Sequence, residues 1–311
     1  MKDLAPIALF VYNRPKETAG LLESLKKNKL AKESLLFIFS DAPKSPEQAE
    51  KVKETRAILN KLSGFKNIEI FESRENNGLA HSVISGVSKI IDRYGKVIVL
   101  EDDLVLANDF LEYMNEALDL YEKNDSIWTV TGYGPPIEID RNYKYDVYLS
   151  YRGCSWGWGT WKDRWEKHDW YLSDYHEFIS SPNLVEKFKK GGSDLLEMLK
   201  LQKIGKLDSW AIRSCYSQAR KNMYTVYPVK SKLQNIGFGE TSTHCTSSGS
   251  KYKTELYENK LNLTDDLNLN DSITYEFKKY YDLDLIGKIG YFLKKHNLYK
   301  YFKWTKTYLR K

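Results

Sequence analysis

The sequence has few cysteines, and this scarcity excludes several kinds of protein. Its 311 residues include only Cys154, Cys215 and Cys245, which are widely spaced and form no C-x-x-C pair. An odd number of isolated cysteines gives neither a disulfide framework nor a cysteine zinc site. We therefore expect a reducing, cytoplasmic environment.

Long apolar runs and targeting segments are also missing. No apolar stretch approaches the ~18 residues that a membrane-spanning helix needs. The apolar stretch Pro6 to Tyr12 is too short for a secretory signal, and no small-residue cleavage site follows it. We expect neither a signal peptide nor a transmembrane segment.

The familiar nucleotide-binding signatures are absent as well. The chain has no G-x-G-x-x-G and no G-x-x-x-x-G-K-[ST], so neither a Rossmann dinucleotide site nor a P-loop is indicated. It has no RNP, KH or zinc-finger pattern, which argues against nucleic acid as a partner. The 48 Lys and Arg residues exceed the 42 Asp and Glu residues, and this net charge of +6 indicates some other anionic partner.

What the first 125 residues do contain is an alternation of short apolar strands and amphipathic helices. We expect strands at Ala5–Tyr12, Leu35–Phe39, Ile68–Phe71 and Val97–Leu100, and helices at Glu17–Lys27, Ser45–Leu62, Leu79–Tyr94 and Ala107–Leu120. This alternation predicts an α/β fold with an open, mostly parallel sheet and helices on both faces. Ligands bind at the carboxyl ends of the strands in such sheets.

Three consecutive carboxylates, Glu101, Asp102 and Asp103, follow the last of these strands. Carboxylates at the end of a buried strand repel one another and lose hydration, so a cation is expected against them, most simply a divalent metal. Alternatively, Asp102 or Asp103 caps the next helix, although one carboxylate would suffice for that. We favour the metal.

The middle of the chain is rich in tryptophan. Strands are expected at Ile127–Gly132 and Tyr145–Tyr151. Five tryptophans interleaved with glycine follow them, at positions 156, 158, 161, 165 and 170. Glycine lets a ligand approach the backbone, and flat indole faces suit pyranose rings. We expect about half of these side chains to be core, and Trp156 or Trp158 to contact a ligand.

Taken together, these segments resemble the nucleotide-sugar glycosyltransferases of the GT-A fold, and most closely the N-acetylglucosaminyltransferase I family. The matching features, in chain order, are Asn13-Arg14, Ser40-Asp41, Asn77-Gly78, the triplet 101–103 followed by Leu104, Asp109-Phe110, Gly157-Trp158-Gly159 and Asp208-Ser209-Trp210. The resemblance covers residues 5 to 245, roughly.

The resemblance implies roles for the residues at the strand ends. Arg14 would lie against the nucleotide, and Asp41 would accept a hydrogen bond from uracil. Glu101 and Asp102 would contact ribose and sugar, while Asp103 would ligate Mn²⁺ or Mg²⁺. Asp41 can equally be an Asx-turn residue ahead of a proline, and Arg14 a surface charge.

Further roles follow for residues later in the chain. His81 would touch the phosphates of the nucleotide, and His244 would complete the metal site. Asp208 would be the catalytic base of an inverting transfer. Its alternative role is that of a plain helix N-cap, since a helix is expected at Ala211–Lys221.

The end of the chain differs from the rest. We expect a catalytic domain at 1–260, with a nucleotide-sugar half (1–125) and an acceptor half (126–260), followed by a connector and tail at 261–311. Leu261–Asp284 is acidic and rich in Asn and suggests an irregular connector. Leu285–Lys311 suggests a basic helix with an aromatic face, which either binds an anionic membrane surface or packs on the domain.

The sequence thus predicts a metal-dependent, inverting glycosyltransferase. It would move a sugar, GlcNAc or a related hexose, from a UDP-sugar to a glycan or lipid-linked acceptor in surface polysaccharide synthesis. It would be cytoplasmic and peripheral on the inner face of the membrane. The alternatives are a nucleotidyltransferase acting on sugar phosphates and a non-catalytic carbohydrate-binding protein.

Overall fold

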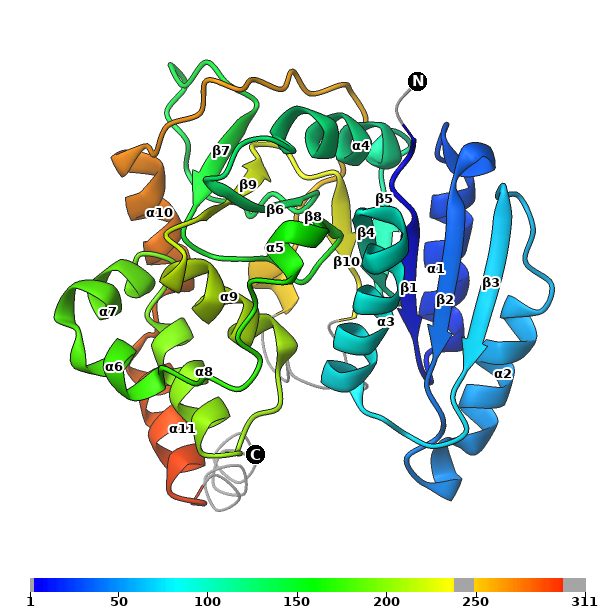
Figure 1. The fold of residues 1–311 in the computed structure, drawn as a ribbon, viewed down its shortest axis with the longest axis horizontal. Helices are drawn as coiled ribbons and strands as arrows, with labels where there is room; N and C mark the ends of the chain where they lie inside the picture. Colours follow the sequence, from blue (N-terminus) through cyan, green and yellow to red (C-terminus); the bar gives the residue numbers. More distant parts are fainter. Residues whose placement is uncertain (1–2, 238–248, 299–311) are drawn as a thin grey trace.

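The computed structural model of the chain describes residues 3–237 and 249–298 (Figure 1). The strands are β1 (Ile7–Val11), β2 (Leu35–Ser40), β3 (Asn67–Glu72), β4 (Lys96–Glu101), β5 (Leu104–Leu106), β6 (Ile127–Thr131), β7 (Val147–Ser150), β8 (Trp158–Trp161), β9 (Tyr224–Pro228) and β10 (Leu233–Asn235). The helices are α1 (Pro15–Lys26), α2 (Ala49–Leu59), α3 (Leu79–Tyr94), α4 (Phe110–Tyr121), α5 (Lys162–Trp165), α6 (Tyr175–Ser180), α7 (Pro182–Lys189), α8 (Asp194–Lys203), α9 (Trp210–Arg220), α10 (Asp271–Tyr281) and α11 (Leu285–Lys295).

A single large sheet runs through both halves of the described chain. Its strand order is β3-β2-β1-β4-β8-β6-β9-β7. Strands β1 to β4 are mutually parallel, β8 is antiparallel to both of its neighbours, and β7 is antiparallel to β9. The predicted α/β class with a mostly parallel central sheet is confirmed. Strands β1 to β4 therefore bring their carboxyl ends to one edge.

Helices cover both faces of the sheet because successive side chains of a strand point to opposite sides. In β1, Ile7 and Leu9 belong to the core beneath α1 and α4, whereas Ala8 and Phe10 belong to the core beneath α3. All four are buried. This explains why β1, β2 and β4 are apolar without alternation.

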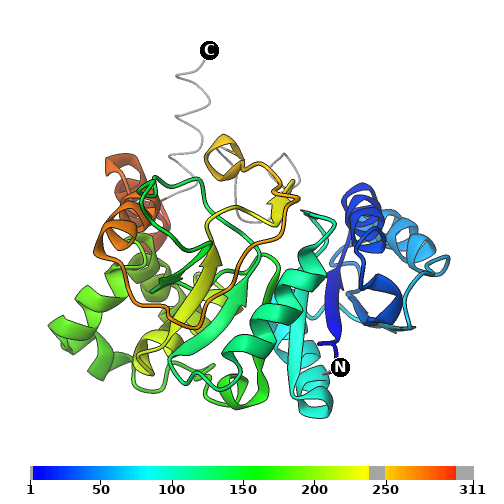
Figure 2. The same ribbon diagram turned by 90° about the horizontal axis from the view of Figure 1, so that it is seen from above.

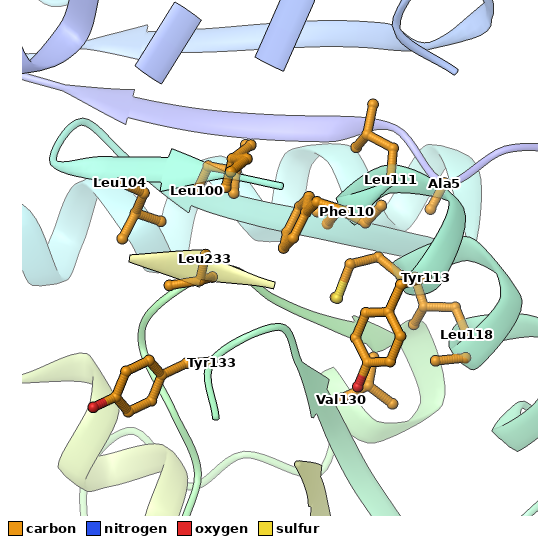
Figure 3. Packing of buried hydrophobic residues seen from close by; sticks show 14 of the residues in the cluster. Ala5, Leu100, Leu104, Phe110, Leu111, Tyr113, Leu118, Val130, Tyr133 and Leu233 are labelled. Carbon is orange, nitrogen blue, oxygen red and sulfur yellow. The ribbon is translucent and has the colours of Figure 1, made fainter. Parts of the chain in front are cut away.

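Strands β5 and β10 form a separate two-stranded antiparallel sheet, and β5 directly follows the triplet in the chain. In Figure 3, Leu104 of β5 and Leu233 of β10 lie close together beside Phe110 at the start of α4. Gly157 has a φ of +51°, and a Cβ there would lie 2.3 Å from Leu233. This close approach requires glycine between the tryptophans.

Most of the tryptophans are packing residues. Trp158 opens β8, is 1% exposed, and stacks on Trp165 and Trp210 at ring-centroid distances of 6.0 and 4.9 Å. The half-buried His168 ring stacks on Trp170 at 4.3 Å. The burial of the Trp158 ring against other rings argues against its contact with a ligand, and of the two predicted residues it favours Trp156.

The segment 261–284 is not an irregular connector throughout, since α10 occupies Asp271–Tyr281. Three of its side chains, Ile273, Phe277 and Tyr281, are buried in the main core. Helix α11 follows at the predicted position, and both views place α10 and α11 on the side of the molecule opposite α1 and α2 (Figures 1 and 2). Among the described residues, no helix is both long and apolar enough to cross a membrane.

Candidate active site

The acidic triplet lies at the carboxyl end of β4, at the edge where β1 to β3 also end. Glu101 is the last residue of β4 and lies beside Phe10 of β1, while Asp102 and Asp103 form the turn into β5. Helix α4 begins only at Phe110. The alternative in which Asp102 or Asp103 caps that helix is therefore wrong, because β5 separates them from it.

Arg14 is the cation that faces these carboxylates. Its Nη1 lies 2.7 Å from Asp103 Oδ2 and 3.5 Å from Asp102 Oδ1. The backbone N–H of Tyr12 also donates to Asp102 Oδ2, at 3.3 Å. Arg14 was predicted to lie against a nucleotide, and the structure places it on the triplet, where its side chain is 13% exposed.

One guanidinium does not compensate three carboxylates. Burial first, and then the charges of Asp103 and Asp102, raise the pKa of Glu101 well above its usual value. Burial first, and then Asp103, raise the pKa of Asp102 to about 7, against the opposing effects of Arg14 and the Tyr12 amide. Burial also raises the pKa of Asp103, although Arg14 opposes it. Among the described residues, the site therefore has a deficit of positive charge.

The end of β10 and the two residues after it contact Asp103. Asn235 donates from Nδ2 to Asp103 Oδ1 at 3.2 Å, and the Ile236 N–H donates to the Asp103 carbonyl at 2.8 Å. A Cβ at Gly237 would lie only 2.0 Å from Asp103 Oδ2. These contacts link segments that are far apart in the sequence, and the only sequence signal for them was the Gly-rich segment that Gly237 begins.

Asp41 organises the loop that leads into α3. Its Oδ1 accepts from the Ala42 and Asn77 N–H groups at 2.9 and 3.0 Å. Its Oδ2 accepts from Asn76 Nδ2 at 3.2 Å and from the Gly78 N–H at 3.0 Å. A carboxylate offers about four acceptor sites, and all are used within the chain. The geometry thus favours the turn role of Asp41 over direct contact with uracil.

Arg56 of α2 donates hydrogen bonds to the backbone around this loop, and nothing in the sequence indicated this role. Its Nη2 donates to the Ser73 carbonyl at 2.8 Å and lies 3.4 Å from the carbonyls of Ser40 and Asp41. It thereby ties the carboxyl end of β2 to the chain that follows β3.

Helix α3 begins directly after this loop. Gly78, with a φ of 75°, occupies its N-cap position, no side chain caps it, and its first turn holds no acidic residue. His81 is exposed in that turn. Such a helix start favours anions, so contact of His81 with phosphates stays a prediction.

Asp208 lies at the same edge of the sheet. Trp158, which pairs with Val99 of β4, stacks on Trp210, two residues after Asp208. The predicted capping role of Asp208 is wrong, because Ser209 is the N-cap of α9 and accepts from the Ile212 N–H at 3.4 Å. The Asp208 carboxylate is 73% exposed and pairs with Arg213 at 2.9 Å. It is open to an incoming hydroxyl, and its role as a base stays a prediction.

Trp156 differs from Trp158. It is half-buried and packs edge-on against Tyr133 at 4.8 Å and Tyr252 at 5.6 Å. It lies two residues before β8, at the triplet edge of the sheet. Its contact with a ligand stays a prediction. His244, the other expected metal ligand, lies outside the described residues.

Within residues 3–237 and 249–298, no three His, Cys, Asp or Glu side chains are grouped so as to hold a metal ion. The described residues therefore do not form a metal site of three or more such side chains. Mg²⁺ commonly uses one or two carboxylates together with substrate phosphates. The charge deficit at Asp102 and Asp103 fits a divalent cation held in that way.

Comparison with known proteins supports sugar transfer. Residues 87–171 match the model of the GNT-I family. The matched segment runs from the middle of α3 through the triplet and the tryptophan-rich stretch. This confirms the resemblance to that family over the segment and supports a glycosyltransferase. No curated protein matches the chain.

Many solved structures are similar to the chain, and three of them illustrate the low identity. TarS residues 1–349 of S. aureus is 14% identical with a TM-score of 0.42, over 75% of this chain and 60% of that one. The same protein in complex with UDP is 15% identical with a TM-score of 0.35, over 59% and 54%. The mannosyltransferase PcManGT from Pyrobaculum calidifontis, in complex with GDP-Man and Mn²⁺, is 14% identical with a TM-score of 0.36, over 52% and 48%. The chain thus spans less than two thirds of the length of each of these solved chains.

Proposed function

We propose that this chain is a metal-dependent, inverting glycosyltransferase that takes its sugar from a UDP-sugar. The transferred group would be a hexosyl or N-acetylhexosaminyl unit, and the acceptor a glycan or lipid-linked saccharide of surface polysaccharide synthesis. The choice of a nucleotide-sugar donor follows the GNT-I resemblance. The observation that carries the proposal is the acidic triplet at the carboxyl end of β4, whose two aspartates share the guanidinium of Arg14.

The charge balance indicates what the site takes. Fully ionised, the triplet carries three negative charges against the one positive charge of Arg14, and the pKa values of Glu101 and Asp102 are raised accordingly. A divalent cation would balance the difference. Asp103, with Asp102 beside it, would hold Mn²⁺ or Mg²⁺, and the bound cation would neutralise the diphosphate of the departing nucleotide.

The chain's own residues would do the rest. The nucleotide would bind at the loop that Asp41 organises and at the start of α3. The phosphates of the nucleotide would lie toward His81. Asp208 would take the proton of the acceptor hydroxyl as that oxygen attacks the anomeric carbon. The nucleotide leaves from the opposite face of the sugar, so the anomeric configuration inverts. Trp156 would offer its ring edge or face to a saccharide.

Titration calorimetry with UDP, in the presence and absence of Mn²⁺, tests the proposal. Asp103→Asn keeps the size of the side chain and removes the charge, while Asp92→Asn removes an exposed carboxylate that pairs with Lys162 on α5. We expect Mn²⁺ to raise UDP affinity at least ~10-fold in the native chain and in the Asp92→Asn control, and to have little effect in Asp103→Asn.

A native chain that does not bind UDP, or an Asp103→Asn variant with full Mn²⁺ dependence, would overturn the proposal. Slow hydrolysis of a panel of nucleotide sugars then identifies the donor. It also separates sugar transfer from nucleotidyl transfer, since only a glycosyltransferase releases free sugar and nucleoside diphosphate.

A further inference from the structure

Helix α11 carries an apolar face that nothing among the described residues covers. Four large apolar side chains on it are exposed: Leu285 by 74%, Ile286 by 59%, Ile289 by 41% and Phe292 by 59%. Their spacing of one, four and seven residues puts them on one side of an α-helix. Exposed apolar residues scattered singly need no explanation, but a continuous stripe indicates an interaction surface.

The opposite side of α11 is attached to the protein. Burial raises the pKa of the Tyr291 hydroxyl, and the charges of Asp194 and Arg152 act on it, so Tyr291 faces the domain. Asp284 caps the helix by accepting from the Gly287 N–H at 2.7 Å. At the other end, Lys206 Nζ donates to the Lys295 carbonyl. The helix is therefore held in place with its apolar face outward.

The positive charge of the chain is concentrated in the same region. Residues 285–311 contain eight Lys or Arg and no Asp or Glu. The whole chain has 48 basic and 42 acidic residues, so the part that precedes Leu285 holds more acidic than basic residues. The net positive charge therefore comes from the segment that begins with α11. Lys288 and Lys295 border one flank of the exposed stripe, by their helical positions.

We propose that α11 lies on the surface of an anionic lipid bilayer. The stripe of Leu285, Ile286, Ile289 and Phe292 would enter the boundary between headgroups and acyl chains, and the flanking lysines would contact the headgroups. A basic helix with a large apolar face is the usual form of an interfacial helix. Each Lys or Arg near an anionic surface adds to the attraction.

Charge complementarity selects this occupant over a second copy of the chain. Two copies that paired through α11 would bring together two segments without a single acidic side chain. Their like charges would oppose association, whereas an anionic bilayer attracts both.

The position of α11 links the bilayer to the candidate active site, and this step rests on the proposed function. The Lys206–Lys295 contact places the end of α11 beside the turn that leads, two residues later, to Asp208. A chain docked through α11 would hold its candidate base close to the headgroup layer. This favours a lipid-linked acceptor over a free, soluble glycan.

Vesicle co-sedimentation of the full chain tests the docking surface. The vesicles are phosphatidylcholine alone and phosphatidylcholine mixed with phosphatidylglycerol. We expect binding to the mixed vesicles that weakens with salt, and little binding to phosphatidylcholine alone. The double variant Ile286→Ser/Phe292→Ser should lose at least ~10-fold in partitioning, and Lys288→Gln/Lys295→Gln several-fold.

The matched control is Tyr275→Ser on α10, which removes a side chain that is 65% exposed outside the stripe. It should bind like the native chain. Equal binding of the native chain and the Ile286→Ser/Phe292→Ser variant would overturn the proposal. So would a native dimer that this variant converts to monomer, because the face would then join two copies.

Donor hydrolysis separates this inference from the proposed function. The α11 variants should hydrolyse the nucleotide sugar as the native chain does. If no form of the chain hydrolyses a nucleotide sugar but vesicle binding follows the expected pattern, the catalytic proposal fails and the membrane surface stands.

Discussion

Replacing Asp208 by Asn separates a catalytic carboxylate from a surface ion pair. The carboxylate is 73% exposed and pairs with Arg213. An exposed pair of this kind contributes less than about 1 kcal/mol to stability. The N-cap of α9 is Ser209, so the helix keeps its cap in the variant. We therefore expect Asp208→Asn to lower the free energy of unfolding by less than about 1 kcal/mol.

The expected effect on turnover is far larger. A positioned general base typically contributes ~10²- to 10⁴-fold in rate, and an amide cannot take the proton of the acceptor hydroxyl. Donor affinity should hardly change, because the triplet, Arg14 and the Asp41 loop lie on β1 to β4 and their connections. The assay is sugar transfer to the acceptor at saturating donor, with UDP affinity measured separately by calorimetry.

Asp174, the residue before α6, supplies a matched control, because its partner lies on the same helix as the partner of Asp208. It is 53% exposed and pairs with Arg220 in the last turn of α9, as Asp208 pairs with Arg213 in the first. Asp174→Asn should cost as little stability as Asp208→Asn and leave turnover unchanged. The reasoning is refuted if both variants turn over equally, or if the product keeps the anomeric configuration of the donor.

Two further predictions test the surroundings of the site. A methyl group at Gly237 would lie 2.0 Å from Asp103 Oδ2. Gly237→Ala should therefore reduce the Mn²⁺-dependent gain in UDP affinity ~10-fold or more, as measured by calorimetry. The control Gly20→Ala should keep the full gain, because a Cβ there meets nothing within 4 Å. Burial lowers the pKa of His168 to about 3, below its unfolded value near 6.5, so the unfolded chain binds more protons between these values. The contribution of His168 to stability should fall as the pH falls through this window, by about 2 kcal/mol between pH 6.5 and 5, while the raised pKa of Asp102 acts in the opposite direction. Chemical unfolding of the native chain and of His168→Asn isolates this contribution, and an equal pH dependence of the two chains would contradict it.

The elements that the sequence predicted best are those whose cause is local. Strands β1, β2 and β4 are runs of buried aliphatic and aromatic residues, and α3 occupies Leu79–Tyr94, the predicted range. In each case the apolar pattern within the segment determines both the element and the face that it buries. Helix α11 also begins at the predicted residue, Leu285, since Asp284 caps it.

The elements that the sequence missed depend on distant partners. The stretch Trp158–Trp161 contains a glycine and a threonine between two tryptophans, which is not a strand pattern by itself. It becomes β8 because it inserts between β4 and β6. The N-cap of α9 is a smaller error of the same kind, because it was assigned to Asp208 and is Ser209. Both residues suit an N-cap, and the packing of Trp210 against Trp158 fixes where the helix begins.

The same distinction applies within the candidate site. The triplet could be found from consecutive residues. The hydrogen bonds that use up the acceptor sites of Asp41, however, come from a separate loop, which follows β3. The close approach of Gly237 to Asp103 joins the chain after β10 to the chain after β4. Patterns within one segment predicted which residues carry charge at the site. They could not predict which of those charges the protein satisfies by itself.

That last property is the one with functional meaning. Asp41 accepts four hydrogen bonds, one from the adjacent Ala42 and three from the loop that follows β3, and such a carboxylate needs nothing from outside. The triplet receives Arg14, the Tyr12 amide and Asn235, and still the pKa values of all three of its carboxyl groups remain raised. A scaffold under pressure for stability alone would favour neutral side chains there, because buried charges without full compensation are destabilising. Local rules fail in this way at functional sites, so the unmet charge supports the proposal that the triplet, rather than the Asp41 carboxylate, binds the cation.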